Sequence, residues 1–145
     1  MPPRPDELAI GAQGAEVRRA SDWLDAACRQ RGVPPALAEQ LALCLNEVLA
    51  NVIIHGGSAA ASEPIRLLFE VELDGDRGRA SVTVSDAGKA FDPLSVPRRT
   101  RPRTLDEASP GGLGLELIRR FCSVLRYRRE GGRNHLTFGT RWPSQ

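Results

Sequence analysis

LALCLNEVLANVIIHG, at residues 41–56, is the stretch of sequence that decides the fold. Leucine, valine and isoleucine fall on every side of the helix that it predicts, and a helix that is apolar nearly all round is buried. Glu47, Asn51 and His55 recur at intervals of four, so they lie along one face about a turn apart. Burying a carboxylate and an amide without partners is costly. The stretch therefore predicts either polar side chains that are satisfied inside the protein or a polar ligand that meets them.

The overall composition indicates one globular domain. A chain of 145 residues is long enough to bury a single core. The net charge of +2 is too small to indicate nucleic acid, so we expect no direct nucleic-acid partner. We also expect no membrane association, because no run of about 18 apolar residues lacks charge and the first residues lack the apolar core of a signal peptide.

The three cysteines, Cys28, Cys44 and Cys122, are odd in number and far apart in the chain. None has the spacing to a second cysteine or a histidine that metal sites show. Cys28 and Cys44 lie within helical apolar patterns, which is typical of small core residues. This usage predicts a reduced, cytoplasmic protein.

Apolar periodicity divides the rest of the chain into helices, which repeat about every 3.6 residues, and strands, which alternate strictly. The predicted helices are residues 14–31, residues 34 to about 55, and a short one after Gly114. The predicted strands are residues 65–73, 80–84, 124–129 and 134–141. Residues 1–13 fit a flexible segment or an edge strand. We therefore predict an α+β fold, a two-layer sandwich with helices on one face of a mostly antiparallel sheet, formed as a single domain by residues 14–145.

Three segments carry candidate chemistry: the polar line in residues 47–55, residues 85–93 after a strand, and residues 111–115 before a helix. Asp86 at a strand end is a fixed acceptor for an exocyclic amine, and Gly88 allows a ring to approach the backbone. Glycine N–H groups at a helix N-terminus bind anions. Asn51 offers a neutral oxygen that suits Mg²⁺. Each segment alone fits a turn or a helix cap, but their order and spacing together favour a site for a purine, a metal and a phosphate chain.

In this order, with a long loop between the last two, the segments resemble the Bergerat-fold ATPases, the histidine-kinase-like ATPase domains. The finer resemblance is to the anti-sigma factor serine/threonine-protein kinases. Residues 46–55 are similar to the family's NExxxNxxxH motif, residues 86–93 to its DxGxxFDP motif, and residues 112–115 with Ile118 to its GLGLxxI motif. The resemblance covers nearly the whole chain, from about residue 17 to residue 141.

The resemblance implies a set of ATP-binding residues. Asn51 would coordinate Mg²⁺, Asp86 would bind the adenine amino group, and Gly88 would shape the adenine pocket. The family's phosphate-lining positions fall on Gly112, Leu113 and Gly114. Thr137 in the last strand is either an extra adenine-side contact or an ordinary strand threonine.

Glu47 matches the family's general base, which would accept the proton of a partner's hydroxyl during phosphoryl transfer. The alternative is a carboxylate that only orients Asn51 or a water molecule. The loop at about residues 91–111 would be the ATP lid, since a long structureless loop is often a functional lid. Its arginines either neutralise phosphates, dock on an acidic partner or are simply solvated; they are Arg98, Arg99, Arg101 and Arg103.

The implied function is an ATP–Mg²⁺-dependent serine/threonine kinase and anti-sigma factor. Its substrate would be a STAS-type anti-anti-sigma protein, its second partner a sigma factor, and a homodimer is a further expectation from the family. The alternative is a nucleotide-dependent protein-binding module of the same fold that transfers no phosphate. A third option is a degenerate member that no longer binds nucleotide.

Overall fold

The computed structural model describes residues 6–95 and 110–143. Within them the chain forms four α-helices, five strands and one short 3-10 helix. The helices are α1 (Gly14–Arg31), α2 (Pro35–His55), α3 (Gly57–Ser62), the 3-10 helix η1 (Pro93–Ser95) and α4 (Pro110–Phe121). The strands are β1 (Asp6–Ile10), β2 (Ile65–Asp74), β3 (Arg77–Asp86), β4 (Val124–Glu130) and β5 (Arg133–Trp142).

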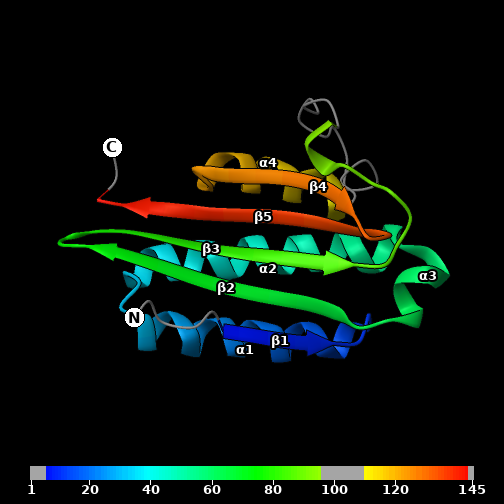
Figure 1. Cartoon of the computed structure of the whole chain (residues 1–145), viewed down its shortest axis with the longest axis horizontal. Coiled ribbons are helices and arrows are strands. Elements are labelled where there is room, and N and C mark those ends of the chain that lie inside the picture. The colour runs from blue at the N-terminus through cyan, green and yellow to red at the C-terminus, as the bar shows by residue number, and fades with distance from the viewer. Residues whose placement is uncertain (1–5, 96–109, 144–145) are drawn as a thin grey trace.

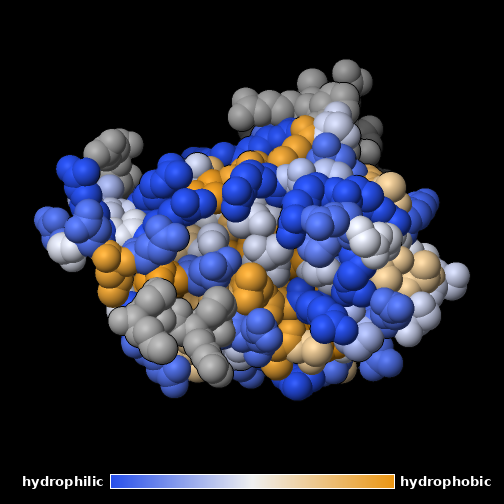
Figure 2. Space-filling view, in the orientation of Figure 1, coloured by the Kyte–Doolittle hydropathy of each residue, from blue (hydrophilic) through white to orange (hydrophobic). Residues whose placement is uncertain are grey.

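The five strands form one sheet in the order β1-β2-β3-β5-β4, and every neighbouring pair is antiparallel. Helices α1, α2 and α4 lie side by side behind this sheet, as Figure 1 shows, and no helix of the described residues packs on its other face, here called the uncovered face. On that uncovered face Figure 2 shows mainly hydrophilic residues with small hydrophobic patches. The predicted α+β sandwich, with helices on one face of an antiparallel sheet, is confirmed.

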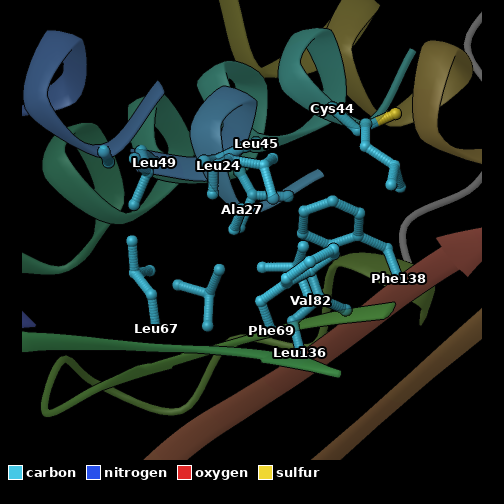
Figure 3. Close-up of a cluster of buried hydrophobic side chains, with 14 of the residues drawn as sticks. Leu24, Ala27, Cys44, Leu45, Leu49, Leu67, Phe69, Val82, Leu136 and Phe138 are labelled. Atoms are coloured by element: carbon cyan, nitrogen blue, oxygen red, sulfur yellow. The ribbon is translucent and has the colours of Figure 1, made fainter. Parts of the chain in front are cut away.

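The core lies between the helices and the covered face of the sheet. Because successive strand residues point to opposite faces, every second residue in the first half of β2 is buried: Ile65, Leu67 and Phe69. On the helical side, Leu24 of α1 and Leu45 of α2 belong to the same cluster (Figure 3). The apolar residues that alternate along the strands and those that repeat every 3.6 residues along the helices thus pack against each other in one core layer.

Helix boundaries follow the residues that punctuate them. Helix α1 ends where Gly32 takes a left-handed conformation, with φ of 75°, and its N–H bonds back to the last turn. Helix α2 begins at Pro35, where a missing N–H costs nothing. By length and composition α2 could cross a membrane, but here it is the central core helix, packed against the sheet and against α1 and α4.

One short helix was missed and one predicted boundary was wrong. Helix α2 ends at His55 as predicted, but a separate six-residue helix, α3, follows at Gly57. Helix α4 begins at Pro110 rather than after Gly114, so the lid predicted for residues 91–111 gives way to a helix earlier than expected. Residues 96–109, including the four lid arginines, lie outside the described residues.

Candidate nucleotide-binding site

A cleft lies where the C-terminal half of α2 meets the end of β3 and the beginning of β5, at the right of the sheet in Figure 1. Its walls combine apolar side chains with a few polar ones. The lining residues are Val48, Asn51, Val52, His55, Gly56, Val84, Asp86, Lys89, Phe91, Pro93, Tyr127, Asn134 and Leu136. An apolar cleft with a few converging polar groups is the usual form of a small-molecule site.

Asp86 is the last residue of β3 and is buried to 6% exposure. The N–H of Gly88 donates to its Oδ1 at 2.9 Å, and the Nδ2 of Asn134 donates to the same oxygen at 3.1 Å. Among the described residues no hydrogen bond uses Oδ2. The carboxylate is therefore held firmly through one oxygen and leaves the other as an acceptor for a ligand's amine.

Asn134 is the residue that the sequence analysis missed. It lies opposite Asp86 in the β3–β5 ladder and is 6% exposed. Besides Asp86, its Nδ2 donates to the carbonyl of Lys89 at 2.9 Å, and its Oδ1 accepts from the Phe91 N–H and the Tyr127 hydroxyl. The signal that was missed is strand alternation. Asn134 is two residues before Leu136 and four before Phe138, so it lies on the same buried face of β5.

Thr137 does not reach the cleft. It alternates with Leu136 and Phe138, so its side chain lies on the uncovered face of the sheet, where its Oγ1 is 2.8 Å from that of Thr83. Of its two predicted roles, the structure gives it that of a strand threonine. The β5 residue that lies beside Asp86 in the cleft is Asn134.

Gly88 lies directly behind the cleft rather than in its wall. A Cβ at this position would come within 2.8 Å of Asp86 Oδ1 and 2.9 Å of the Gly56 Cα. Arg129 donates to the Gly88 carbonyl at 2.7 Å. The glycine therefore lets the turn after β3 close onto the end of α2, and this contact sets the position of Asp86 relative to the helix.

Asn51 projects from α2 into the same cleft and is 7% exposed. Its Nδ2 is fully buried and has no hydrogen-bond partner among the described residues. Buried polar atoms are nearly always paired, so an unpaired one in a cleft marks a place for a ligand or water. The unpaired Nδ2 is a donor, which suits an oxygen of a ligand or a water molecule, whereas the metal role that the motif implies would fall to the oxygen of the same amide.

His55 and Phe91 close the outer side of the cleft. Their rings stack with centroids 5.4 Å apart and an angle of 23° between planes. The space left inside is about 40 Å³, enough for a few water molecules and too small for a purine.

Glu47 lies one turn before Asn51 on α2, half-buried and outside the cleft lining. Burial raises the pKa of its carboxyl group above the ordinary value. A carboxylate with a raised pKa is a better proton acceptor at neutral pH, provided that it remains ionised. The helix thus carries the candidate base and the candidate metal ligand on consecutive turns.

Gly112, Leu113 and Gly114 lie inside the first turns of α4, not before the helix. Helix α4 packs against α2, which brings its N-terminal end to the side of the sheet that carries the cleft. The described part of the lid is anchored on the same side, because Asp92 Oδ1 accepts from the Leu94 N–H and Arg119 of α4 donates to the Leu94 carbonyl.

Comparison with known proteins places this architecture in a family. The sequence model of the histidine kinase-like ATPase domain matches residues 10–140, so the chain belongs to that family. The serine/threonine-protein kinase BtrW of Bordetella bronchiseptica is 32% identical to it over 137 residues, which is 94% of each protein. The family that the three motifs indicated is therefore confirmed.

Two solved structures share the fold. The first contains the RsbU and RsbW domains of Rv1364c from Mycobacterium tuberculosis; it matches 99% of this chain and 34% of its own, with a TM-score of 0.66 and 18% identity. The second is the SiaB–SiaC complex from Pseudomonas aeruginosa, which matches 95% of this chain and 91% of its own, with a TM-score of 0.56 and 14% identity. At these identities the likeness concerns the fold alone.

Proposed function

We propose that this protein binds ATP with Mg²⁺ and transfers the γ-phosphoryl group to a serine or threonine of a STAS-type anti-anti-sigma protein. In the same scheme it holds a sigma factor when that partner is phosphorylated. The single observation that carries the proposal is the meeting, in one cleft, of a half-satisfied Asp86 carboxylate and an unpaired buried Asn51 amide in a member of an ATPase family.

The chain's own residues suit these tasks. Asp86 presents Oδ2 to the amino group of a purine, while Asn134 and Gly88 keep the carboxylate from turning. Asn51 supplies an amide oxygen to Mg²⁺, which when bound would neutralise charge on the phosphates. The glycines in the first turns of α4 offer N–H groups to the phosphate chain.

Glu47 is the proposed general base. It accepts the hydroxyl proton of the partner's serine or threonine as the phosphoryl group is transferred. Its half-buried position on α2 keeps it within reach of solvent and of a docking protein, while burial raises its pKa toward neutrality.

The choice of substrate rests on relatives. BtrW is named as a serine/threonine-protein kinase and is similar along 94% of this chain. Both solved structures that share the fold contain a second component. The first holds an RsbU domain together with an RsbW domain, and the second is the SiaB–SiaC complex. Homodimer formation and a cytoplasmic location complete the proposal.

The second candidate is a binding module that holds nucleotide and partner without phosphoryl transfer. The position of Glu47, half-buried and outside the cleft lining, favours the binding module, because the carboxylate there could orient Asn51 without contacting a substrate. The two candidates differ in what Glu47→Gln does.

The test starts with a pull-down from the native cytosol with tagged protein, once with ATP–Mg²⁺ and once with ADP, followed by mapping of partner phosphosites. Phosphotransfer is then measured for wild type, Glu47→Gln and Glu39→Gln, the last being an exposed carboxylate two turns earlier on α2. We expect Glu47→Gln to lose transfer at least 100-fold while calorimetry shows unchanged ATP affinity, and Glu39→Gln to behave as wild type. Equal transfer by Glu47→Gln would exclude the base assignment, and recovery of a partner without new phosphate would favour the binding module.

A further inference from the structure

Two cysteine thiols face each other where α2 packs against the end of α4. Cys44 lies in the middle of α2, and Cys122 is the first residue after α4. Their sulfur atoms are 3.7 Å apart, and both cysteines are free. In Figure 3 the Cys44 sulfur points away from the leucine cluster, toward the neighbouring helix. The contact joins two helices that are far apart in the sequence.

Only one of the two sulfurs can be reached from outside. Cys44 has no exposed surface, whereas Cys122 is partly exposed. Cys122 lines a second cleft of about 660 Å³ at the left end of the sheet in Figure 1, opposite to the nucleotide cleft. This volume admits small molecules freely.

The second cleft favours a negatively charged sulfur. Its described lining includes Arg77, Arg120 and Arg141 and no carboxylate side chain. The Cys122 sulfur is hydrogen-bonded to the Cys44 sulfur, and the backbone of Gly139 contributes a further hydrogen bond. These hydrogen bonds outweigh burial and lower the pKa of the Cys122 thiol, while the same contact and burial raise the pKa of Cys44. The accessible cysteine is thus the reactive one.

We propose that Cys122 and Cys44 are an oxidation site, at which hydroperoxides convert the thiol pair into an intramolecular disulfide. The Cys122 thiolate attacks one peroxide oxygen, the O–O bond breaks, and Cys122 becomes a sulfenic acid as hydroxide or alkoxide leaves and takes up a proton. The Cys44 sulfur then attacks the Cys122 sulfur, expelling the sulfenic oxygen, which leaves as water with the Cys44 proton. For hydrogen peroxide, two thiols and one peroxide yield one disulfide and two waters.

The geometry requires a modest movement. A disulfide needs its sulfurs about 2.05 Å apart, so the pair must close by about 1.7 Å from its present 3.7 Å. Cys122 lies in the two-residue link between α4 and β4, tied by its N–H to the Ile118 carbonyl. Rotation of the two side chains together with a small shift of this link supplies the movement without repacking α2.

The cross-link would fix α4 against α2. Glu47 follows Cys44 by one helical turn, and Gly112 to Gly114 lie at the other end of the helix that precedes Cys122. Oxidation would therefore tie together the two elements to which we assign the base and the phosphate site. This consequence rests on the proposed function, whereas formation of the disulfide does not.

Cys28 provides an internal control. It is fully buried, and burial together with the nearby Asp25 carboxylate raises the pKa of its thiol to about 12. Among the described residues no sulfur hydrogen bond involves it. It should remain a thiol under conditions that consume the other two.

The test is thiol counting on the reduced full-length protein after brief exposure to dilute hydrogen peroxide at neutral pH. Remaining thiols are alkylated in denaturant and counted by intact mass, and cross-linked peptides are mapped. We expect the three thiols of the chain to fall to one, Cys28, with a single peptide joining Cys44 to Cys122, and reductant to restore all three. The melting temperature should rise by roughly 5–10 °C on oxidation, because the bond closes a loop of nearly 80 residues.

Matched variants separate the two steps. Cys122→Ser should keep both remaining thiols, and Cys44→Ala should stop at a Cys122 sulfenic acid that a dimedone probe captures. Three intact thiols after treatment, loss of Cys28, or a bond between two chains seen on a non-reducing gel would each overturn the proposal. None of these outcomes depends on ATP binding or kinase activity, so failure here and failure of the proposed function are distinguishable.

Discussion

Asn134 is the position where one substitution should most affect both the fold and the nucleotide cleft. Its side chain makes hydrogen bonds with the Asp86 carboxylate, the Lys89 carbonyl, the Phe91 N–H and the Tyr127 hydroxyl. It thereby connects the end of β3, the start of the lid and β4. We predict that Asn134→Ala destabilises the protein and weakens ATP binding together.

The magnitude follows from the bonds lost. The bond to Asp86 is charge-assisted and contributes about 1.5–3 kcal/mol, and each neutral bond contributes about 0.5–1.5 kcal/mol. Asp86 keeps its bond from Gly88, and water reaches Lys89 and Phe91, so part of the loss is recovered. We expect Asn134→Ala to lower the free energy of unfolding by about 3 kcal/mol.

Asn134→Asp keeps the shape but replaces the donating amide with a second carboxylate beside Asp86. At an effective dielectric of about 20, two charges 4 Å apart repel by about 4 kcal/mol, so at neutral pH this variant should be less stable than Asn134→Ala. One proton shared between the carboxylates relieves the repulsion, and its pKa in the folded state is raised above the unfolded value of about 3.9. That stabilisation is present at low pH and is lost as the pH rises through the folded pKa.

The assay is urea unfolding followed by circular dichroism at pH 5 and pH 8 for wild type and both variants. Thr137→Ala is the matched control, because it removes one hydroxyl on the same strand but on the uncovered face. The Asp variant should gain stability relative to the Ala variant as the pH falls. A loss below about 1 kcal/mol for Asn134→Ala, or equal stability of the two variants at pH 8, would refute the network's role.

Four further outcomes are expected. Asn51→Ala should abolish Mg²⁺-dependent ATP binding with little loss of stability, because its Nδ2 has no partner to lose among the described residues; calorimetry with and without Mg²⁺ checks this, and retained binding would contradict the metal role. Gly88→Ala should lower stability by about 1–3 kcal/mol, since the added methyl would lie 2.8 Å from the Asp86 oxygen; an unchanged melting temperature would show that the turn relaxes. Phe138→Ala should cost about 3–5 kcal/mol in chemical unfolding, because it empties the centre of the core. Phosphotransfer should rise with pH through the raised pKa of Glu47, and a pH profile that Glu47→Gln leaves unaltered would argue against its ionisation being the cause.

Much of the fold could be predicted because helices and strands leave local patterns. The bounds of α1 and α2 were predicted to within a residue, since glycine and proline punctuate a clear apolar period. Helix α3 was missed because six residues, mostly alanine and serine, are too short to show periodicity. The start of α4 was placed too late, since glycines are poor helix formers and here stand in the first turns.

The site was predicted in part for a similar reason. Asn51 and Asp86 were found because each lies in a recognisable element, Asn51 within a helix and Asp86 at a strand end, and the structure brings both to one cleft. Asn134 was missed and the two roles of Thr137 were left open because the choice between neighbouring residues of a strand depends on which face is covered. A shift of one residue moves a side chain to the opposite face of the sheet, so this choice needs the register against β3.

By itself the sequence determined the class of fold, the family and the polar line on α2. Periodicity and motif spacing depend only on residues that are close together in the sequence. Only the tertiary structure decided that Asn134 holds Asp86, that Phe91 covers the cleft against His55, and that Cys44 meets Cys122. These contacts join residues that are 36 to 78 positions apart. Such pairs form only when strand register and helix packing are set together, and neither is encoded within a local window of residues.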